Sequence, residues 1–228
     1  MDVRIQFLGT SDFAQVVLEK LKKRFTIVDS NPDLIVVASY GKILPKEQIE
    51  TPKYGALNVH PSLLPKYRGP SPLQAAILNG DRVSGVTILK LDEQMDHGPI
   101  LAKKEVELSE DETFDSWSKK GFEIGAEMLV DLIPDYISGK LSPTSQDDTQ
   151  ATYCKLVKKE DGYFEIDKVP ENLDRMIRAY YPWPGAWTKW NGKVVKFLPG
   201  GQVQMEGKKA TDLKSFLNGY PDFPIKEL

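Results

Sequence analysis

Apolar residues recur along the chain in short runs that alternate with turns and amphipathic stretches. Strands are expected at 3–8, 33–38 and 56–59, and the run at 33–38 is apolar almost throughout. Strands of this kind are typical of a parallel sheet that helices cover on both faces. After the first run, Gly9–Asp12 supplies a turn and a helix N-cap, and we expect a helix that ends near residue 24. The pattern predicts an α/β fold with an open, mostly parallel, Rossmann-like sheet.

Further elements follow in the middle of the chain. We expect a short helix from Pro45, a helix over 71–78, strands over 85–91 and 100–108, and a long helix from about residue 114. Apolar side chains at three- and four-residue spacing mark one face of the long helix, and we interpret them as core packing rather than cofactor contacts. These are Phe114, Trp117, Ile124, Met128, Leu132 and Tyr136.

The last third of the chain has a different pattern. The polar stretch 142–151 is interpreted as the exit from the first domain. Beyond it, a helix over 170–180 precedes three short strands, separated by Asn-Gly and Gly-Gly turns, which form a small β-rich domain. The strands are expected at Ala186–Trp190, Lys193–Leu198 and Gln202–Met205. We therefore predict domains over 1–150 and 170–228, joined by a linker over 151–169.

Composition and charge add to this picture. The chain has 228 residues, of which 40% are hydrophobic and 28% charged, as in globular proteins. No apolar run approaches the roughly 20 residues that span a bilayer. The charged start and the single Cys154 favour the cytoplasm over an oxidising compartment. We also expect no membrane partner and a monomer. The net charge of −3 divides unevenly, because residues 1–150 carry −6 and residues 151–228 carry +3.

The two histidines lie in loops that follow predicted strands. Asn58 and His60 are two residues apart, so they point to one face at the end of a strand, where open α/β sheets bind ligands. An amide can stabilise an oxyanion, and an imidazole can transfer a proton near neutral pH. Asp96, in the loop 92–99, is a suitable carboxylate partner if this loop meets the Pro-rich loop 61–70.

Other interpretations of these residues are structural. Taken alone, Asn58 could cap a turn, His60 could be a buried core histidine, and Asp96 could form an Asx-turn. His97 is compatible with a solvent-facing loop residue or with electrostatic tuning of Asp96. No spacing of histidine and acidic residues supports a metal site, and neither Ser62 nor Cys154 has the surroundings of a nucleophile.

The stretch from Asn58 to Pro72, NVHPSLLPKYRGPSP, resembles the signature of the folate-dependent formyltransferases. Similarity continues at Gly85–Ile88, Met95–Gly98, Ile177–Gly185 and near both ends of the chain. The chain is therefore identified as a shortened member of this family, most similar to those members that formylate methionyl initiator tRNA.

The resemblance implies a site and a donor. Asn58, His60 and Asp96 match the catalytic trio of the family, and the donor is 10-formyltetrahydrofolate, used as a cosubstrate without a metal. The residues that match the folate-contacting positions are Ser62, Leu63, Leu64 and Pro65, with main-chain groups of Ile43, Leu44 and the loop 91–96.

The acceptor implied by the resemblance is the α-amine of methionyl initiator tRNA. The C-terminal stretch interleaves lysines with Trp187 and Trp190, which could hold phosphates and stack on a base, or could be solvated lysines around a small core. The residues expected to contact tRNA are Arg68, Lys189, Lys193, Lys196, Lys208 and Lys209.

Two departures from the family pattern concern this acceptor. An αβ stretch is missing between Val28 and Asn31, and the C-terminal barrel is reduced around 197–203. A nucleotide-linked amino sugar therefore stays open as an alternative acceptor. A noncatalytic folate- or RNA-binding protein is the alternative from another class.

Overall fold

The computed structural model describes residues 3–228, which form two compact units. The first contains the chain up to Pro72, together with Val83–Leu108 and Ser118–Lys155. The second contains Leu73–Arg82, Ser109–Trp117 and Leu156–Leu228. Two segments that precede Ser118 thus belong to the second unit, whereas a contiguous division near residue 150 assigns them to the first domain.

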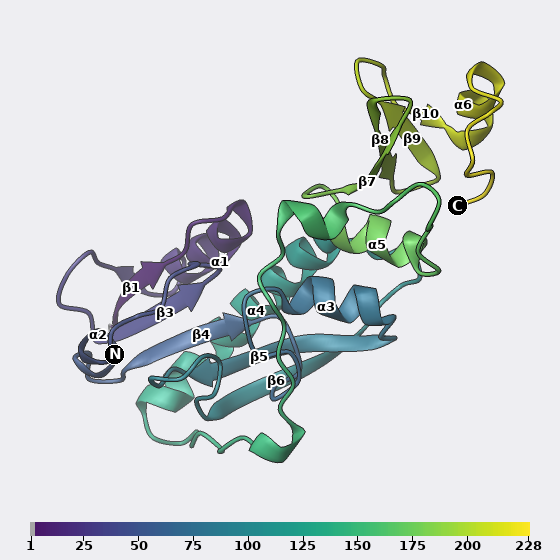
Figure 1. Ribbon diagram of the computed structural model, residues 1–228. Helices are drawn as coiled ribbons and strands as arrows, with labels where there is room; N and C mark the ends of the chain where they lie inside the picture. The colour runs from purple at the N-terminus through teal and green to yellow at the C-terminus, as the bar shows by residue number, and fades with distance from the viewer. Residues whose placement is uncertain (1–2) are drawn as a thin grey trace. The chain divides into compact units, whose positions relative to one another are not determined.

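The first unit is built on a six-stranded sheet with the order β2-β1-β3-β4-β5-β6 (Figure 1). The first four strands are parallel, whereas β5 and β6 run antiparallel to their neighbours. This arrangement confirms the predicted open, mostly parallel sheet. The strands are β1 (Arg4–Leu8), β2 (Thr26–Ile27), β3 (Leu34–Ala38), β4 (Ala56–His60), β5 (Val83–Lys90) and β6 (Ile100–Glu107).

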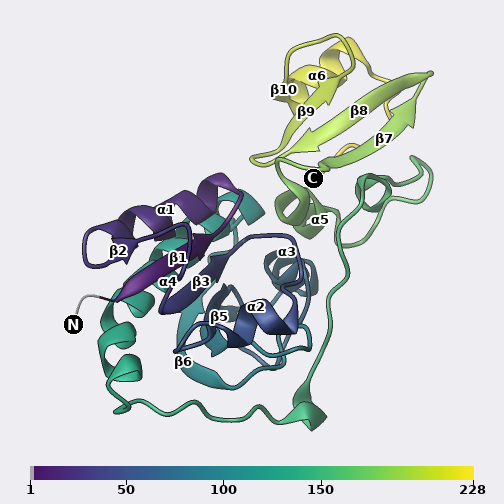
Figure 2. The ribbon, with the colours of Figure 1, turned by 90° about the vertical axis from the view of Figure 1, so that its left-hand side faces the viewer.

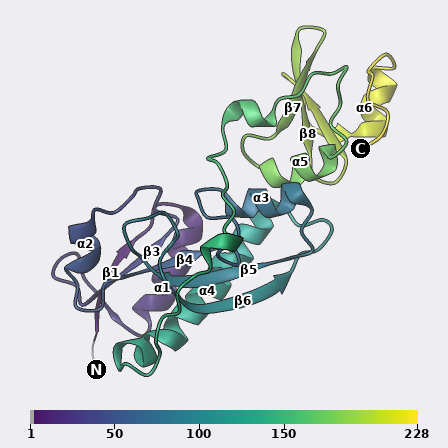
Figure 3. The ribbon, with the colours of Figure 1, turned by 60° about the horizontal axis from the view of Figure 1, so that its bottom comes forward.

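In the first unit, α1 (Asp12–Lys22) neighbours the part of α4 (Phe114–Ile137) that begins at Ser118 (Figure 3). The Ser11 side chain accepts a hydrogen bond from the backbone N–H of Ala14, an N-cap that typically contributes about 1 kcal/mol. The rings of Phe13 and Phe122 stack with centroids 6.3 Å apart. Gly125 allows α4 to approach β4, because an added Cβ would lie 2.3 Å from Cγ1 of Val59.

The face of the sheet opposite to α4 is covered in part by α2 (Lys46–Glu50) (Figure 2). This helix follows Pro45, as expected. Ile49 of α2 belongs to a buried apolar cluster with Leu44 and with side chains of β3 and β4. All five residues of β3 are buried, because the sheet is covered on both faces.

The second unit is built on an antiparallel sheet with the order β10-β9-β8-β7. Its three longest strands have the predicted bounds, whereas β10 and α6 were not predicted from the pattern. Its strands are β7 (Ala186–Trp190), β8 (Lys193–Leu198), β9 (Gln202–Met205) and β10 (Thr211–Asp212). Its helices include α5 (Leu173–Tyr180), α6 (Leu213–Gly219) and all of α3 (Pro72–Asn79) except Pro72. Short 3₁₀ helices lie at Asp148–Gln150 in the first unit and Lys159–Gly162 in the second.

One face of this small sheet is core and the other is exposed. Val195, Phe197 and Val203 are almost completely buried, together with apolar side chains of α3, α5 and α6. Because side chains alternate along a strand, Lys196 points to the other face, next to its cross-strand partners Trp187 and Gln204. Among residues 3–228, no helix is both long and apolar enough to cross a membrane.

Candidate active site

Asn58 and His60 lie at the carboxyl end of β4. Asn58 is opposite Val37 and His60 is opposite Thr87 in the neighbouring strands. Because Val59 lies between them and packs toward α4, Asn58 and His60 point to the other face of the sheet, the face that α2 partly covers. The two-residue spacing therefore brings an amide and an imidazole together at the carboxyl end of a parallel strand.

Both ring nitrogens of His60 have oxygen neighbours. Its Nε2 lies 3.0 Å from the carbonyl oxygen of Tyr67, and its Nδ1 lies 3.5 Å from Oδ1 of Asp96. A carbonyl oxygen only accepts hydrogen bonds, so Nε2 carries a hydrogen and the ring is held in one orientation. The side chain of His60 is 5% exposed and that of Asp96 is 12% exposed. The two side chains are thus largely shielded from solvent.

Asp96 attaches its loop to the Pro-rich loop. Its Oδ2 accepts a hydrogen bond from the backbone N–H of Gly69 at 2.7 Å, and its backbone carbonyl accepts one from Nε2 of Gln146 at 2.8 Å. The backbone of Asp96 has a φ of 50°, a conformation that non-glycine residues rarely adopt. The expectation that loops 61–70 and 92–99 meet in space is confirmed.

The Pro-rich loop is fastened to β5 and β6 by its main chain. The hydroxyl of Thr87 donates to the carbonyl of Ser62 at 2.6 Å and accepts from the backbone N–H of Leu64 at 3.2 Å. Nζ of Lys103 donates to the carbonyl of Leu64 at 2.9 Å. Three polar contacts therefore fix the path of the loop beside His60.

The residues expected to contact folate differ in exposure. Ser62 and Leu64 are buried, and Leu44 is 7% exposed, so these three support the loops from within. Leu63 and Pro65 are half-buried, whereas the side chain of Ile43 is 77% exposed.

The polar segment 144–154 also holds the loops of the candidate site in place. Thr144 forms a backbone bridge with Ile100, and Tyr153 forms one with Arg68. Between these points, Gln146 donates to the carbonyl oxygens of both Asp96 and Gly98. The pattern alone predicted only a domain exit here, because the polar side chains that bind the site loops have the same composition as a solvated linker.

Arg68 is buried and binds the segment 144–154 instead of lying on the surface. Its side chain is 2% exposed, and its guanidinium donates to Oε1 of Gln146 and to Oδ1 of Asp148, the latter at 2.7 Å. The other oxygen of Asp148 lies 3.4 Å from Nε2 of His97, whose Nδ1 lies 2.6 Å from Oδ2 of Asp92. His97 is thus enclosed by two carboxylates, and the hydrogen bond to Asp92 is the main cause of its raised pKa.

Cys154 lies at the end of the same segment. Its thiol contacts the carbonyl oxygen of Arg68 and accepts from the backbone N–H of Ser71 at 3.3 Å. Burial raises the pKa of the thiol, so less thiolate is present at a given pH than in an exposed cysteine. Among residues 3–228, no group of three or more His, Cys, Asp or Glu side chains is arranged to hold a metal ion.

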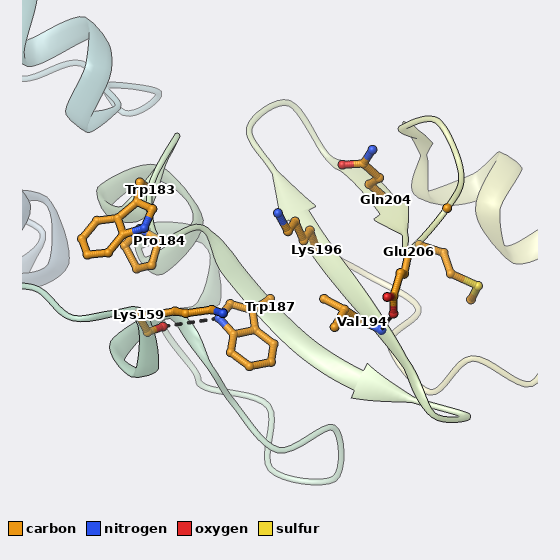
Figure 4. A pocket seen from close by; sticks show the side chains of 10 residues that line it. Lys159, Trp183, Pro184, Trp187, Val194, Lys196, Gln204 and Glu206 are labelled. Atoms are coloured by element: carbon orange, nitrogen blue, oxygen red, sulfur yellow. Dashed lines mark hydrogen bonds between the residues drawn. The ribbon is translucent and has the colours of Figure 1, made fainter.

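A second candidate site lies in the second unit, where a cleft of about 480 Å³ opens on the exposed face of the small sheet (Figure 4). Trp183 and Pro184 form one side, and Lys196, Gln204 and Glu206 come from β8, β9 and the turn that follows. Trp183 was not singled out as a site residue, although its exposed fraction of 57% is unusual for a large aromatic side chain.

The two tryptophans of the C-terminal stretch differ. Trp187 lines the cleft and lies against Tyr163, with ring centroids 4.8 Å apart. Trp190 packs edge-on against Tyr220 and Phe223 at the core. The five lysines expected to contact tRNA, Lys189, Lys193, Lys196, Lys208 and Lys209, are all exposed.

Two family profiles match the sequence. The profile described as formyl transferase matches residues 19–133, and that of the formyl transferase C-terminal domain matches residues 156–200. Both matches lie within the described part of the chain, and together they extend from the first helix to the small sheet.

Curated relatives carry the name methionyl-tRNA formyltransferase. That of Roseiflexus castenholzii is 45% identical over 172 residues, covering 75% of this chain and 55% of the relative. That of Lachnospira eligens is 37% identical over 227 residues, covering 83% of this chain and 72% of the relative. The chain spans about half the length of several curated relatives that it matches.

Solved structures share the fold. Methionyl-tRNA formyltransferase from Clostridium thermocellum has a TM-score of 0.69 at 22% identity and covers 92% of this chain and 98% of that one. A formyltransferase from Anoxybacillus kamchatkensis, solved with a UDP-linked formamido sugar and tetrahydrofolate, has a TM-score of 0.56 at 25% identity, with 67% and 86% covered.

Proposed function

The chain belongs to the formyl transferase family, and from this premise we propose that it transfers the formyl group of 10-formyltetrahydrofolate to the α-amine of methionyl initiator tRNA. The observation that carries the proposal is the meeting of His60 and Asp96, 36 residues apart in sequence, beside the amide of Asn58. None of these groups acts as a covalent nucleophile. The formyl carbon is therefore attacked directly by the amine.

The attacking amine forms a bond to the formyl carbon, whose oxygen gains negative charge. The Asn58 amide stabilises this oxyanion as a hydrogen-bond donor, and His60 assists through its Nδ1–H, because its Nε2–H is already donated to the carbonyl of Tyr67. Asp96 collects the proton that the amine sheds, directly or through one water molecule. The bond from the formyl carbon to N10 of the folate then breaks, and N10 takes the proton that Asp96 collected, so that tetrahydrofolate and the formylated amine are released.

The surroundings of the trio fit a folate cosubstrate. Exposed Ile43 and half-buried Leu63 and Pro65 offer apolar surface to a planar ring, while main-chain groups of the loop 91–96 offer donors and acceptors. The buried Ser62 and Leu64 act by holding the loop. A small number of polar groups in an otherwise apolar lining is the usual composition of a small-molecule site.

The second unit supports a nucleic-acid acceptor. The cleft beside Trp183 and Trp187 combines aromatic rings with the ammonium groups of Lys159 and Lys196. Aromatic rings stack on unpaired bases, and lysines neutralise phosphates. The names of the curated relatives favour the same acceptor. Arg68 is buried, so the proposed tRNA contact is assigned to the exposed lysines.

A nucleotide-linked amino sugar is the second candidate acceptor, because a solved relative was obtained with a UDP-linked formamido sugar. The decisive experiment offers the purified protein 10-formyltetrahydrofolate with either charged initiator tRNA or a UDP-linked amino sugar, and detects the formylated product by mass spectrometry. We expect formylated methionine only on the tRNA. Formylation of the sugar alone would overturn the acceptor, and no formylation of either would overturn the activity.

A further inference from the structure

We propose that His97 is a positioning residue that, as an imidazolium, bridges Asp92 and Asp148 and thereby holds the loop carrying Asp96 against the segment 144–154. This proposal concerns the arrangement of the site, and its consequence for catalysis rests on the function proposed above. The bridge joins the start of the loop 92–99 to a residue more than 50 positions further along the chain.

The positions of the two ring nitrogens determine which protonation state completes the bridge. Nδ1 lies 2.6 Å from Oδ2 of Asp92, and Nε2 lies 3.4 Å from Oδ2 of Asp148. A carboxylate only accepts hydrogen bonds, so both contacts are favourable only when both nitrogens carry hydrogen. A neutral ring that keeps its bond to Asp92 directs a lone pair at Asp148.

The charges around the ring balance only when His97 is protonated. Asp92 and Asp148 are the carboxylates that face it, and Arg68 is the cation that binds the other oxygen of Asp148. Asp96, the preceding residue, directs its carboxylate to His60 and Gly69 instead. With His97 neutral, Arg68 still neutralises Asp148, but the ring no longer supplies a positive charge to Asp92. The pKa of His97 is accordingly raised, first by Asp92 and opposed by burial, with a further contribution from Asp148.

The bridge adjoins the contacts that define the position of Asp96. Gln146, two residues before Asp148, donates to the carbonyl oxygens of Asp96 and Gly98 on either side of His97. Its own Oε1 is fixed by Arg68. If the contact between His97 and Asp148 is lost, the hydrogen bonds from the Gln146 side chain are the side-chain contacts that still attach the loop 92–99 to the segment 144–154. A displacement of about 1 Å at a catalytic group can reduce the rate by about 100-fold.

The direction of the pKa shift determines how the bridge depends on pH. A raised pKa in the folded protein means that the bridge contributes fully below the ordinary histidine pKa of 6.5 and is lost as the pH rises through the raised value. The segment 144–154 should therefore be held most firmly in mildly acidic solution. Catalysis would then decline toward alkaline pH, although deprotonation of the attacking amine by itself favours the reaction.

The first test needs no activity. Because the chain contains only His60 and His97, NMR titration of the imidazoles is resolved, and the signals are assigned with His97→Gln. We expect the pKa of His97 to fall part of the way toward 6.5 in Asp148→Asn, because Asp92 is the larger cause of the shift, and to stay unchanged in Asp147→Asn. Asp147 is the matched control, since its carboxylate accepts from Thr149 and Gln150 instead. An unchanged pKa in Asp148→Asn, or an equal fall in both variants, would overturn the bridge.

The second test measures kcat for formyl transfer between pH 6 and 9. We expect kcat of the wild type to fall about tenfold through the His97 titration, as a partial misplacement of Asp96 would cause, with little change in KM for the folate. His97→Gln should already have the lower kcat at pH 6 and should not show this fall of kcat with rising pH. An identical profile in His97→Gln would overturn the positioning role. If neither acceptor is formylated, the proposed function fails, whereas the NMR titration still decides the bridge.

Discussion

The backbone N–H of Gly69 donates to Oδ2 of Asp96 at 2.7 Å, which fixes one oxygen of the carboxylate. The other oxygen is thereby directed at Nδ1 of His60. Gly69 has a φ of 118°, and an added Cβ would lie 2.4 Å from the carbonyl oxygen of Cys154. A glycine is therefore needed where the Pro-rich loop, the loop of Asp96 and the segment 144–154 come together.

Replacing Asp96 by Asn tests its role as proton acceptor. The amide oxygen of Asn can still accept the bond from Gly69, so we expect an unchanged fold, measured by circular dichroism and thermal unfolding. kcat should fall by about 10²–10⁴-fold, the usual contribution of a general base. Asp135→Asn, an exposed carboxylate on α4, is the control and should retain activity. Wild-type kcat in Asp96→Asn would refute the assigned role.

Replacing Asn58 by Ala removes an oxyanion donor. We expect kcat to fall by about 10²–10³-fold, as is usual for the loss of one such donor. Binding of tetrahydrofolate, measured by calorimetry, should stay within about twofold, because the product has no developing oxyanion. A weakened folate affinity with an unchanged kcat would instead show that the Asn58 amide binds the folate in the ground state.

Replacing Gly69 by Ala should destabilise the first unit. The added methyl group would collide with the carbonyl of Cys154, and overpacking of this kind typically costs about 1–3 kcal/mol. Urea denaturation measures the change in the free energy of unfolding. Gly192→Ala provides a comparison, because Gly192 also has a positive φ but has open space around its Cβ position. Equal losses in the two variants would exclude the collision as the cause.

The ion pair between Arg4 and Asp33 predicts a pH dependence of stability. The guanidinium lowers the pKa of Asp33 to about 2, so the stabilising contribution is present above about pH 4 and is lost as the pH falls toward 2. Urea midpoints of the wild type and Asp33→Asn should therefore differ at pH 6 and converge near pH 2. A constant difference across this range would contradict the assigned shift.

The cleft of the second unit predicts separate effects for an aromatic and a charged residue. Trp183→Ala should raise KM for charged tRNA by about tenfold, since stacking contributes about 1–3 kcal/mol per base. Lys196→Ala should raise the same KM and reduce the salt dependence of binding by about one phosphate contact. Lys140→Ala, an exposed lysine of the first unit, serves as the control. Unchanged tRNA affinity in both cleft variants would remove the cleft from the acceptor site.

Elements with a strong local pattern were predictable from the sequence. Strands β7, β8 and β9 have the expected bounds because Asn191-Gly192 and Gly200-Gly201 mark the turns between them. The two-residue strands β2 and β10 have no usable periodicity. Helix α6 was missed although Asp212 is a readable N-cap, with its side chain accepting from the backbone N–H of Ser215.

The candidate site was only partly predictable. The spacing of Asn58 and His60 places them on one face, and the family signature adds Asp96. The partners that hold these groups come from far along the chain, as with Gln146 and Asp148, and no local pattern links them to the loops that they contact. Polar residues are selected here for specific bonds, and composition alone cannot distinguish such bonds from solvation.

The second unit takes residues 73–82 and 109–117 from between segments of the first unit. Ile77 in the earlier of these segments is 2% exposed, and it is covered by apolar residues such as Phe164 and Met176 that lie about 90 or more positions later. During synthesis from the amino terminus, this apolar surface therefore emerges from the ribosome long before its partners. Completion of the second unit is a late event, and a nascent chain stopped before α5 would present a chaperone with a ready binding site.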